Sequence, residues 1–134
     1  MSRAWPREGE LSVQQRTEVL VGVARGLEYL HQFGIVHQDM KPANVLLDAN
    51  MQAKVLDVGL VRMTEGTAVN HTRVVATPGY VDPAYSHTNK ATPMADVHCY
   101  GVMLLEVITM RHVILSVDGA GCNIRDWVRV AGYH

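Results

Sequence analysis

The chain has 134 residues, of which 48% are hydrophobic, and this suits a single globular domain with a buried core. Its 12 basic and 13 acidic residues give a formal net charge of -1 at pH 7, so the chain lacks the strong positive field that attracts nucleic acid or anionic membranes. We therefore expect no nucleic-acid partner. No stretch approaches the roughly 20 apolar residues of a membrane span, so we also expect no membrane contact from this chain itself.

The first predicted element is a long helix. Residues 1–10 form a charged lead-in that we expect to be disordered, and the domain begins at residue 11. Ser12 followed by Gln15 is typical of a capping box, and Gly34 is a typical helix end. Between them, apolar residues recur at helical spacing and predict a helix of about 20 residues with one face toward a core: Leu20, Val23, Ala24, Leu27 and Leu30.

The next stretch, Ile35 to Asp48, reads IVHQDMKPANVLLD. Its two apolar runs, 35–36 and 45–47, predict short buried strands. Pro42 fixes its own φ and restricts Lys41, so we expect the segment between the strands to be an irregular loop and not a helix.

Three polar side chains of this loop suit phosphoryl transfer. Asp39 is placed to orient an attacking hydroxyl or accept its proton, and Lys41 to neutralise charge on the transferring group. Asn44 offers a carbonyl oxygen to a hard cation such as Mg²⁺.

A predicted hairpin follows. A turn at 48–50 leads into a strand from Ala53 to Leu56, and the next residue is Asp57. An aspartate between a strand and a glycine is common in loops, but the hairpin would bring Asp57 beside Asn44 and so favours a metal-binding role.

The remaining chain predicts one long loop and two helices. Residues 60–82 lack periodicity and indicate a surface loop. Thr92-Pro93 is a typical helix start, and the helix it opens runs through Thr109, apolar around most of its circumference and therefore expected to be central. Asp96, in its first turn, suits the helix dipole. Beyond Arg111 we expect a loop with an apolar patch, and 124–130 predicts a last helix.

The stretch HQDMKPAN, from His37 to Asn44, resembles the catalytic loop of protein kinases, in the serine/threonine form, with plant receptor-like kinases as the nearest subgroup. Other motifs follow in the order of that family: Asp57-Val58-Gly59 resembles its Asp-Phe-Gly, and Thr77-Pro78-Gly79-Tyr80 resembles the end of its activation segment. The resemblance implies an α+β, mainly α fold: an incomplete lower (C-terminal) lobe in residues 11–134, with the upper lobe and the last helices missing from this chain.

What the resemblance implies for the site is transfer of the γ-phosphoryl group of ATP, with Mg²⁺, to serine or threonine hydroxyls of a protein substrate. Asp39 and Lys41 would be catalytic. The cofactor-binding residues would be Asn44, Leu46 and Asp57, of which Asn44 and Asp57 would hold the metal. The substrate-docking residues would be Thr77 and Gly79, and the structural supports His37 and Asp96, the latter receiving backbone N–H groups of the loop.

Location and partners are implied in the same way. A receptor or an upstream kinase is a possible partner, and the chain is expected in the cytoplasm, at the cytoplasmic face of the plasma membrane if the full-length protein is a receptor-like kinase. Departures from the family pattern at Gln38, Val58 and Ala84, and the missing upper lobe, leave a second hypothesis open. In it, the chain is a degenerate, pseudokinase-like binding module that acts through protein interactions.

Overall fold

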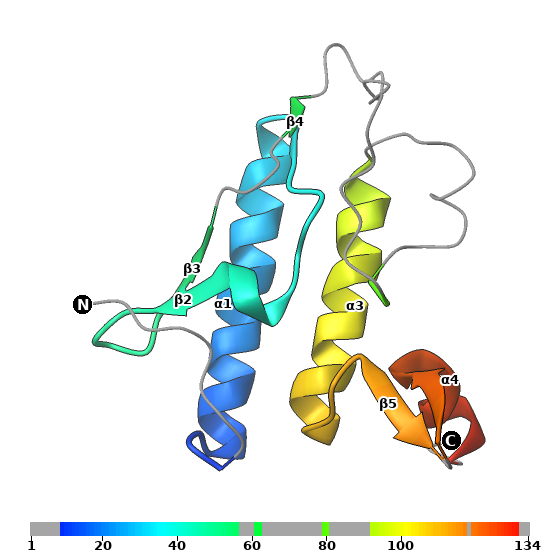
Figure 1. Cartoon of the computed structure of the whole chain (residues 1–134). Helices are drawn as coiled ribbons and strands as arrows, with labels where there is room; N and C mark the ends of the chain where they lie inside the picture. Colours follow the sequence, from blue (N-terminus) through cyan, green and yellow to red (C-terminus); the bar gives the residue numbers. More distant parts are fainter. Residues whose placement is uncertain (1–8, 57–60, 63–78, 81–91, 118, 132–134) are drawn as a thin grey trace.

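The computed structural model describes residues 9–56, 61–62, 79–80, 92–117 and 119–131. Two long helices lie side by side in this part of the chain, α1 (Val13–Gln32) and α3 (Pro93–Thr109), and a short helix, α4 (Ile124–Val130), packs against α3 (Figure 1). The described strands form two-stranded antiparallel sheets: β1 (Ile35–Val36) with β4 (Val61–Arg62), β2 (Val45–Leu47) with β3 (Ala53–Val55), and β5 (Ile114–Val117) with β6 (Ala120–Asn123). None of the described helices has the length and apolar character to cross a bilayer.

Helix α1 begins at the predicted capping box. The Ser12 hydroxyl accepts a hydrogen bond from the Gln15 N–H at 3.1 Å, and the Gln15 side chain accepts one from the Ser12 N–H at 2.9 Å. The helix ends at Gln32, before Gly34 with its φ of 66°. Of the predicted apolar stripe, Leu20, Val23 and Leu27 are buried and Ala24 and Leu30 are half-buried. Val19, which the stripe did not include, is buried as well.

Helix α3 begins as predicted but is less buried than expected. The Thr92 hydroxyl accepts from the Ala95 N–H at 3.2 Å, and Pro93 takes the first helical position. One side buries residues such as Val102 and Met103, whereas Val97 is 51% exposed and Ile108 67% exposed. Helix α3 contacts α1, α4 and β1, as expected of a central helix, but its apolar surface is not buried on every side in the described part of the chain.

Polar contacts join α1 to α3 along their length. The Arg16 guanidinium donates to the Val107 carbonyl oxygen at 3.2 Å, and the Tyr100 hydroxyl donates to the Leu20 carbonyl oxygen at 2.9 Å. Since the beginning of α1 contacts the end of α3, the two helices run antiparallel. The end of α1 therefore lies beside the beginning of α3.

The β2–β3 hairpin confirms the predicted turn. The Asp48 carboxylate accepts from the N–H groups of Asn50 at 2.9 Å and Gln52 at 3.0 Å, and these donors, Gln52 foremost, lower the pKa of Asp48. The hairpin packs closely on α1 because α1 carries glycine where the two meet: a Cβ at Gly26 would lie 3.2 Å from Cγ2 of Val55.

The segment after Arg111 differs from its prediction. In place of a loop, the chain forms the β5–β6 hairpin, in register from Ile114 opposite Asn123 to Val117 opposite Ala120. Its apolar residues do not make one patch, since Val113 is 3% exposed and belongs to the core while Ile114 is 43% exposed. Val113 directly precedes β5 and packs in the core, whereas Ile114 is the first residue of the strand.

Candidate active site

The loop between β1 and β2 has a defined backbone. Gln38 has a φ of 74°, unusual for a residue with a side chain, and Lys41 is extended at φ -162°. Pro42 to Asn44 form one turn of 3-10 helix, which corrects the expectation of a wholly irregular loop. Proline fits at the start of this turn because a first helical residue needs no N–H donor.

This backbone brings Asp39, Lys41 and Asn44 together. The Lys41 ammonium nitrogen lies 3.4 Å from Oδ2 of Asp39. The Asn44 side-chain amide donates to the Asp39 carbonyl oxygen at 2.7 Å and to Oδ2 at 3.2 Å. Asp39 and Asn44 are both 8% exposed. A carboxylate held in this way has a fixed direction and can accept a proton from a hydroxyl placed against it.

His37 connects the loop to the end of β3. Its side chain is fully buried, and its Nδ1 accepts from the Asp39 N–H at 3.1 Å. Since Nδ1 is the acceptor, the ring proton is assigned to Nε2, which hydrogen bonds to the Leu56 carbonyl oxygen. The Leu56 N–H in turn donates to the Asn44 carbonyl oxygen at 2.9 Å. The N–H and the carbonyl oxygen of Leu56 are therefore both hydrogen-bonded, and Leu56 directly precedes Asp57.

Asp96 fixes the other end of the loop. It is completely buried in the first turn of α3. Its Oδ2 accepts from the His37 N–H at 2.7 Å and its Oδ1 from the Gln38 N–H at 2.8 Å. These are backbone N–H groups of the loop, as the resemblance implied, and they hold Gln38 in its left-handed conformation.

The other predicted site residues lie apart from this cluster or outside the described part. Leu46 is half-buried in β2, on the face opposite Val45 and Leu47. Gly79 has a φ of 90°, and its carbonyl oxygen accepts from the Asn123 amide at 3.1 Å. A Cβ at this position would lie against the side chains of Val113 and Ile114. Asp57 and Thr77 fall outside the described residues.

Glu106 was missed by the sequence analysis. It is 9% exposed, its Oε2 accepts from the Tyr80 hydroxyl, and its Oε1 accepts from the Val113 N–H at 2.6 Å. Burial, reinforced by the hydrogen bond to Glu106, raises the pKa of Tyr80 well above its ordinary range. The available signal was the sequence itself: an acid inside the apolar run LLEVI needs a buried partner.

Comparison with known proteins identifies the class to which this fold and site belong. The model of the protein kinase domain matches residues 1–128. The chain belongs to the protein kinase family, and the described part is a mixed α/β portion of a kinase domain.

The relatives are plant receptor-like kinases. The chain is 45% identical over 108 residues to the receptor protein kinase WSS1 of Oryza sativa subsp. japonica, a match that covers 78% of this chain and 12% of the rice protein. It is 40% identical over 125 residues to the probable LRR receptor-like serine/threonine-protein kinase RKF3 of Arabidopsis thaliana, a match that covers 90% of this chain and 20% of that protein. It is also 40% identical over 123 residues to the receptor protein-tyrosine kinase CEPR1 of Arabidopsis thaliana, a match that covers 88% of this chain and 13% of that protein. The chain thus spans a fifth or less of the length of these relatives.

Proposed function

We propose that the chain is the lower lobe of a serine/threonine protein kinase, which transfers the γ-phosphoryl group of ATP to hydroxyls of a protein substrate. The observation that carries the proposal is the contact of Lys41 and Asn44 with Asp39, at 3.4 Å and 3.2 Å from Oδ2. Phosphoryl transfer depends mainly on positioning and on stabilising charge, and this cluster offers a fixed carboxylate, a cation and an amide.

Each member of the cluster has its own role. Asp39 orients the substrate hydroxyl and accepts its proton. Lys41 balances the negative charge that develops on the transferring group, from a position beside the same carboxylate. His37 and Asp96 support the loop through the hydrogen bonds to Asp39, His37 and Gln38.

Mg²⁺ and ATP fit the remaining groups. The nitrogen of the Asn44 amide donates to Asp39, so its oxygen is the atom directed to a cation, and oxygen is the ligand that Mg²⁺ prefers. Asp57 would be the second metal ligand, since it directly follows Leu56, which hydrogen bonds to Asn44. When bound, Mg²⁺ neutralises the phosphate oxygens of ATP. Leu46, on the face of β2 away from the core, would contact the nucleotide.

Serine and threonine hydroxyls are proposed as acceptors because a lysine, Lys41, lies two positions after Asp39. Thr77 and Gly79 would belong to the segment on which the protein substrate docks. The names of the relatives support a protein hydroxyl as acceptor but include both a serine/threonine and a tyrosine kinase. They also support action at the cytoplasmic face of the plasma membrane, with a receptor or an upstream kinase as partner. The 134 residues contain no glycine-rich phosphate loop, so the chain alone would transfer little phosphate.

A segment exchange tests the proposal. The chain would replace the matching 125 residues of the Arabidopsis serine/threonine relative, and transfer from labelled ATP to a protein substrate would be measured. We expect label on serine and threonine, reduced at least 100-fold by Asp39→Asn, since a general base contributes on the order of 10²–10⁴-fold. Asp48→Asn is the control, because Asp48 lies in the β2–β3 turn.

Two results would contradict the proposal. Label found only on tyrosine would refute the substrate class. A chimera that folds and binds ATP but transfers no phosphate would favour the binding module.

A further inference from the structure

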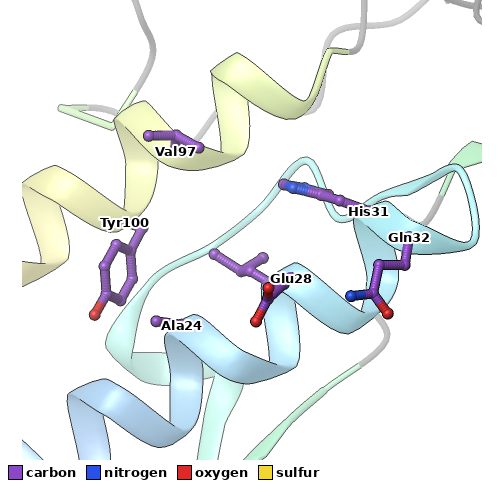
Figure 2. A pocket seen from close by; sticks show the side chains of 7 residues that line it. Ala24, Glu28, His31, Gln32, Val97 and Tyr100 are labelled. Carbon is purple, nitrogen blue, oxygen red and sulfur yellow. The ribbon is translucent and has the colours of Figure 1, made fainter.

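Helix α3 packs against α1 and α4 with different residues. Figure 2 shows Val97 and Tyr100 of α3 at a pocket that residues of α1 complete. His98, which lies between them in sequence, instead contacts α4: its Nε2 is 3.3 Å from Nη1 of Arg125. Since a guanidinium can only donate, Nε2 is assigned as the acceptor and the ring proton is assigned to Nδ1. Arg125 therefore meets a neutral imidazole here and no negative charge.

Arg125 is a half-buried cation without a counter-charge in the described part of the chain. Its Nε–H donates to Oδ1 of Asn123 at 3.1 Å, and one hydrogen of Nη1 is donated to His98. The N–H groups of Nη2 have no acceptor among the described residues, and no described carboxylate forms an ion pair with Arg125. Removing a guanidinium from water costs free energy that neutral partners offset only in part.

The described carboxylates of α3 and α4 are engaged elsewhere. Asp96 and Glu106 are buried and already hydrogen-bonded. Asp126 follows Arg125 in sequence, but its carboxylate lies 3.8 Å from Arg129. Within the described residues, no group is therefore left to supply the counter-charge of Arg125, and an incoming carboxylate would supply it.

The Arg125–His98 pair lies beside the segment Gly79–Tyr80. The Asn123 side chain joins the pair to this segment, because its Oδ1 accepts from Arg125 and its amide donates to the first carbonyl oxygen of the segment at 3.1 Å. The Cys99 thiol, one residue after His98, donates to the second carbonyl oxygen at 3.2 Å. Residues adjoining the pair thus hold two consecutive peptide groups of the segment.

We propose that the Arg125–His98 pair is an anion-binding site that selects protein substrates with an acidic side chain near the acceptor hydroxyl. The assignment rests on the proposed function, in which Gly79 belongs to the segment where the substrate docks. Nη2 remains for the carboxylate, and charge-assisted contacts of arginine with carboxylates are among the stronger hydrogen bonds. Because His98 and Asn123 hold the rest of the guanidinium, its direction is set before the substrate arrives.

Peptide substrates that differ in one residue test the proposal. A single aspartate is moved stepwise along a neutral serine peptide, and each peptide has a partner with asparagine at the same place. The kcat and KM of each pair are measured with the chimeric kinase of the segment exchange. At one position we expect KM to be about tenfold lower for the aspartate peptide. We expect kcat to change little, because the contact binds the substrate and the transition state alike.

Substitutions at Arg125 identify the residue responsible. Arg125→Met should bring the ratio of the two KM values close to one, and Arg125→Glu should reverse the preference in favour of a lysine at the same place. The matched control is Arg129→Met, which removes the same charge one turn further along α4 from a side chain that is 81% exposed, and it should retain the preference. Should Arg125→Met not fold, Arg125→Lys replaces it. This variant keeps the charge but loses the planar fork, and the preference should fall to about threefold.

The proposal is overturned if aspartate is favoured at no position, or if substitution of Arg125 leaves the preference unchanged. A chimera that transfers no phosphate would count against the proposed function alone. The same labelled peptides are then titrated with the 134-residue chain, followed by fluorescence anisotropy, and we expect the same ratio in the dissociation constants. Equal constants for each aspartate peptide and its asparagine partner would refute the anion-binding site.

Discussion

The hydroxyl of Tyr80 donates a hydrogen bond to the buried carboxylate of Glu106, 26 residues further along the chain. The second oxygen of Glu106 accepts from the Val113 N–H at 2.6 Å. One side chain of α3 therefore holds both the segment at Gly79–Tyr80 and the residue that precedes β5. The first two predictions concern this contact.

Tyr80→Phe removes one donor from a buried carboxylate. A hydrogen bond to a charged group contributes about 1.5–3 kcal/mol, so we expect the free energy of unfolding to fall by about 2 kcal/mol. Tyr100→Phe is the matched control: its hydroxyl donates to the neutral Leu20 carbonyl, and its loss should be about 1 kcal/mol. Urea unfolding near neutral pH measures both, and a larger loss in the control would contradict the prediction.

The same contact predicts a pH dependence. Burial raises the pKa of Tyr80 above its ordinary value of 10.0, and Glu106 raises it further. Above pH 10 the folded chain therefore keeps the Tyr80 proton that the unfolded chain has released. The stability contributed by this hydrogen bond is complete below pH 10.0, the ordinary pKa, and is lost as the pH rises above it. Between about pH 9 and 11, wild type should lose stability more steeply than Tyr80→Phe, by at most about 1.4 kcal/mol per pH unit. Parallel pH profiles would rule this out.

Gly79→Ala should destabilise the chain strongly. Its φ is +90°, and an added Cβ would lie 2.6 Å from Cγ2 of Val113. Left-handed strain of about 1–2 kcal/mol and overpacking of about 1–3 kcal/mol should together reduce the unfolding free energy by about 3 kcal/mol. Gly119→Ala shares the positive φ, at +81°, but its Cβ would meet no atom within 4 Å, so about 1 kcal/mol is expected. Thermal or urea unfolding compares the two, and equal losses would show that the contact with Val113 is unimportant.

Two glycines inside helices are expected to respond differently to substitution by alanine. Gly101 lies inside α3 with open space where a Cβ would be, so Gly101→Ala should stabilise the chain by about 0.5–1 kcal/mol. Gly26→Ala is also helical, but its Cβ would lie 3.2 Å from Cγ2 of Val55, and the gain should be smaller or reversed. A decrease in melting temperature for Gly101→Ala would contradict this reasoning.

The chain should self-associate through exposed aromatic surface. Tyr29 of α1 and Phe33, the residue that caps the end of α1, are each 62% exposed, with ring centroids 4.9 Å apart. Joined apolar surface of this kind promotes association. Light scattering after size-exclusion chromatography should show species larger than a monomer, reduced by the double substitution Tyr29→Ser and Phe33→Ser. The matched control is Val13→Ser, 71% exposed at the other end of α1. A monomer at all concentrations would refute the prediction.

Local signals were sufficient for the helices and for the loop. The Ser12 and Thr92 caps, the helical spacing of apolar residues and Gly34 are all readable within a few positions, and both long helices begin where these signals lie. The loop cluster was predictable because Asp39, Lys41 and Asn44 are so close in sequence that the backbone alone brings them together.

Contacts between distant segments were not predictable in the same way. The pairing of β1 with β4 and the role of Glu106 depend on residues far apart in sequence. The β5–β6 hairpin did have a local signal, since Asp118-Gly119 is a typical two-residue turn, but the apolar run before it was interpreted as a loop. The exposure of Val97 depends on which segments pack against α3, and the spacing of apolar residues along the sequence does not indicate which segments these are.

The anchor of the loop on Asp96 spans 58 and 59 residues of sequence. Closing a flexible loop becomes more costly only slowly with length, by about 0.6 kcal/mol for each doubling. Changes of chain length in this interval that leave β2, β3 and β4 paired should therefore cost little, and Asp96 would still reach the same two N–H groups. The anchor therefore couples the loop to α3 in space without fixing the number of residues that separate them in sequence.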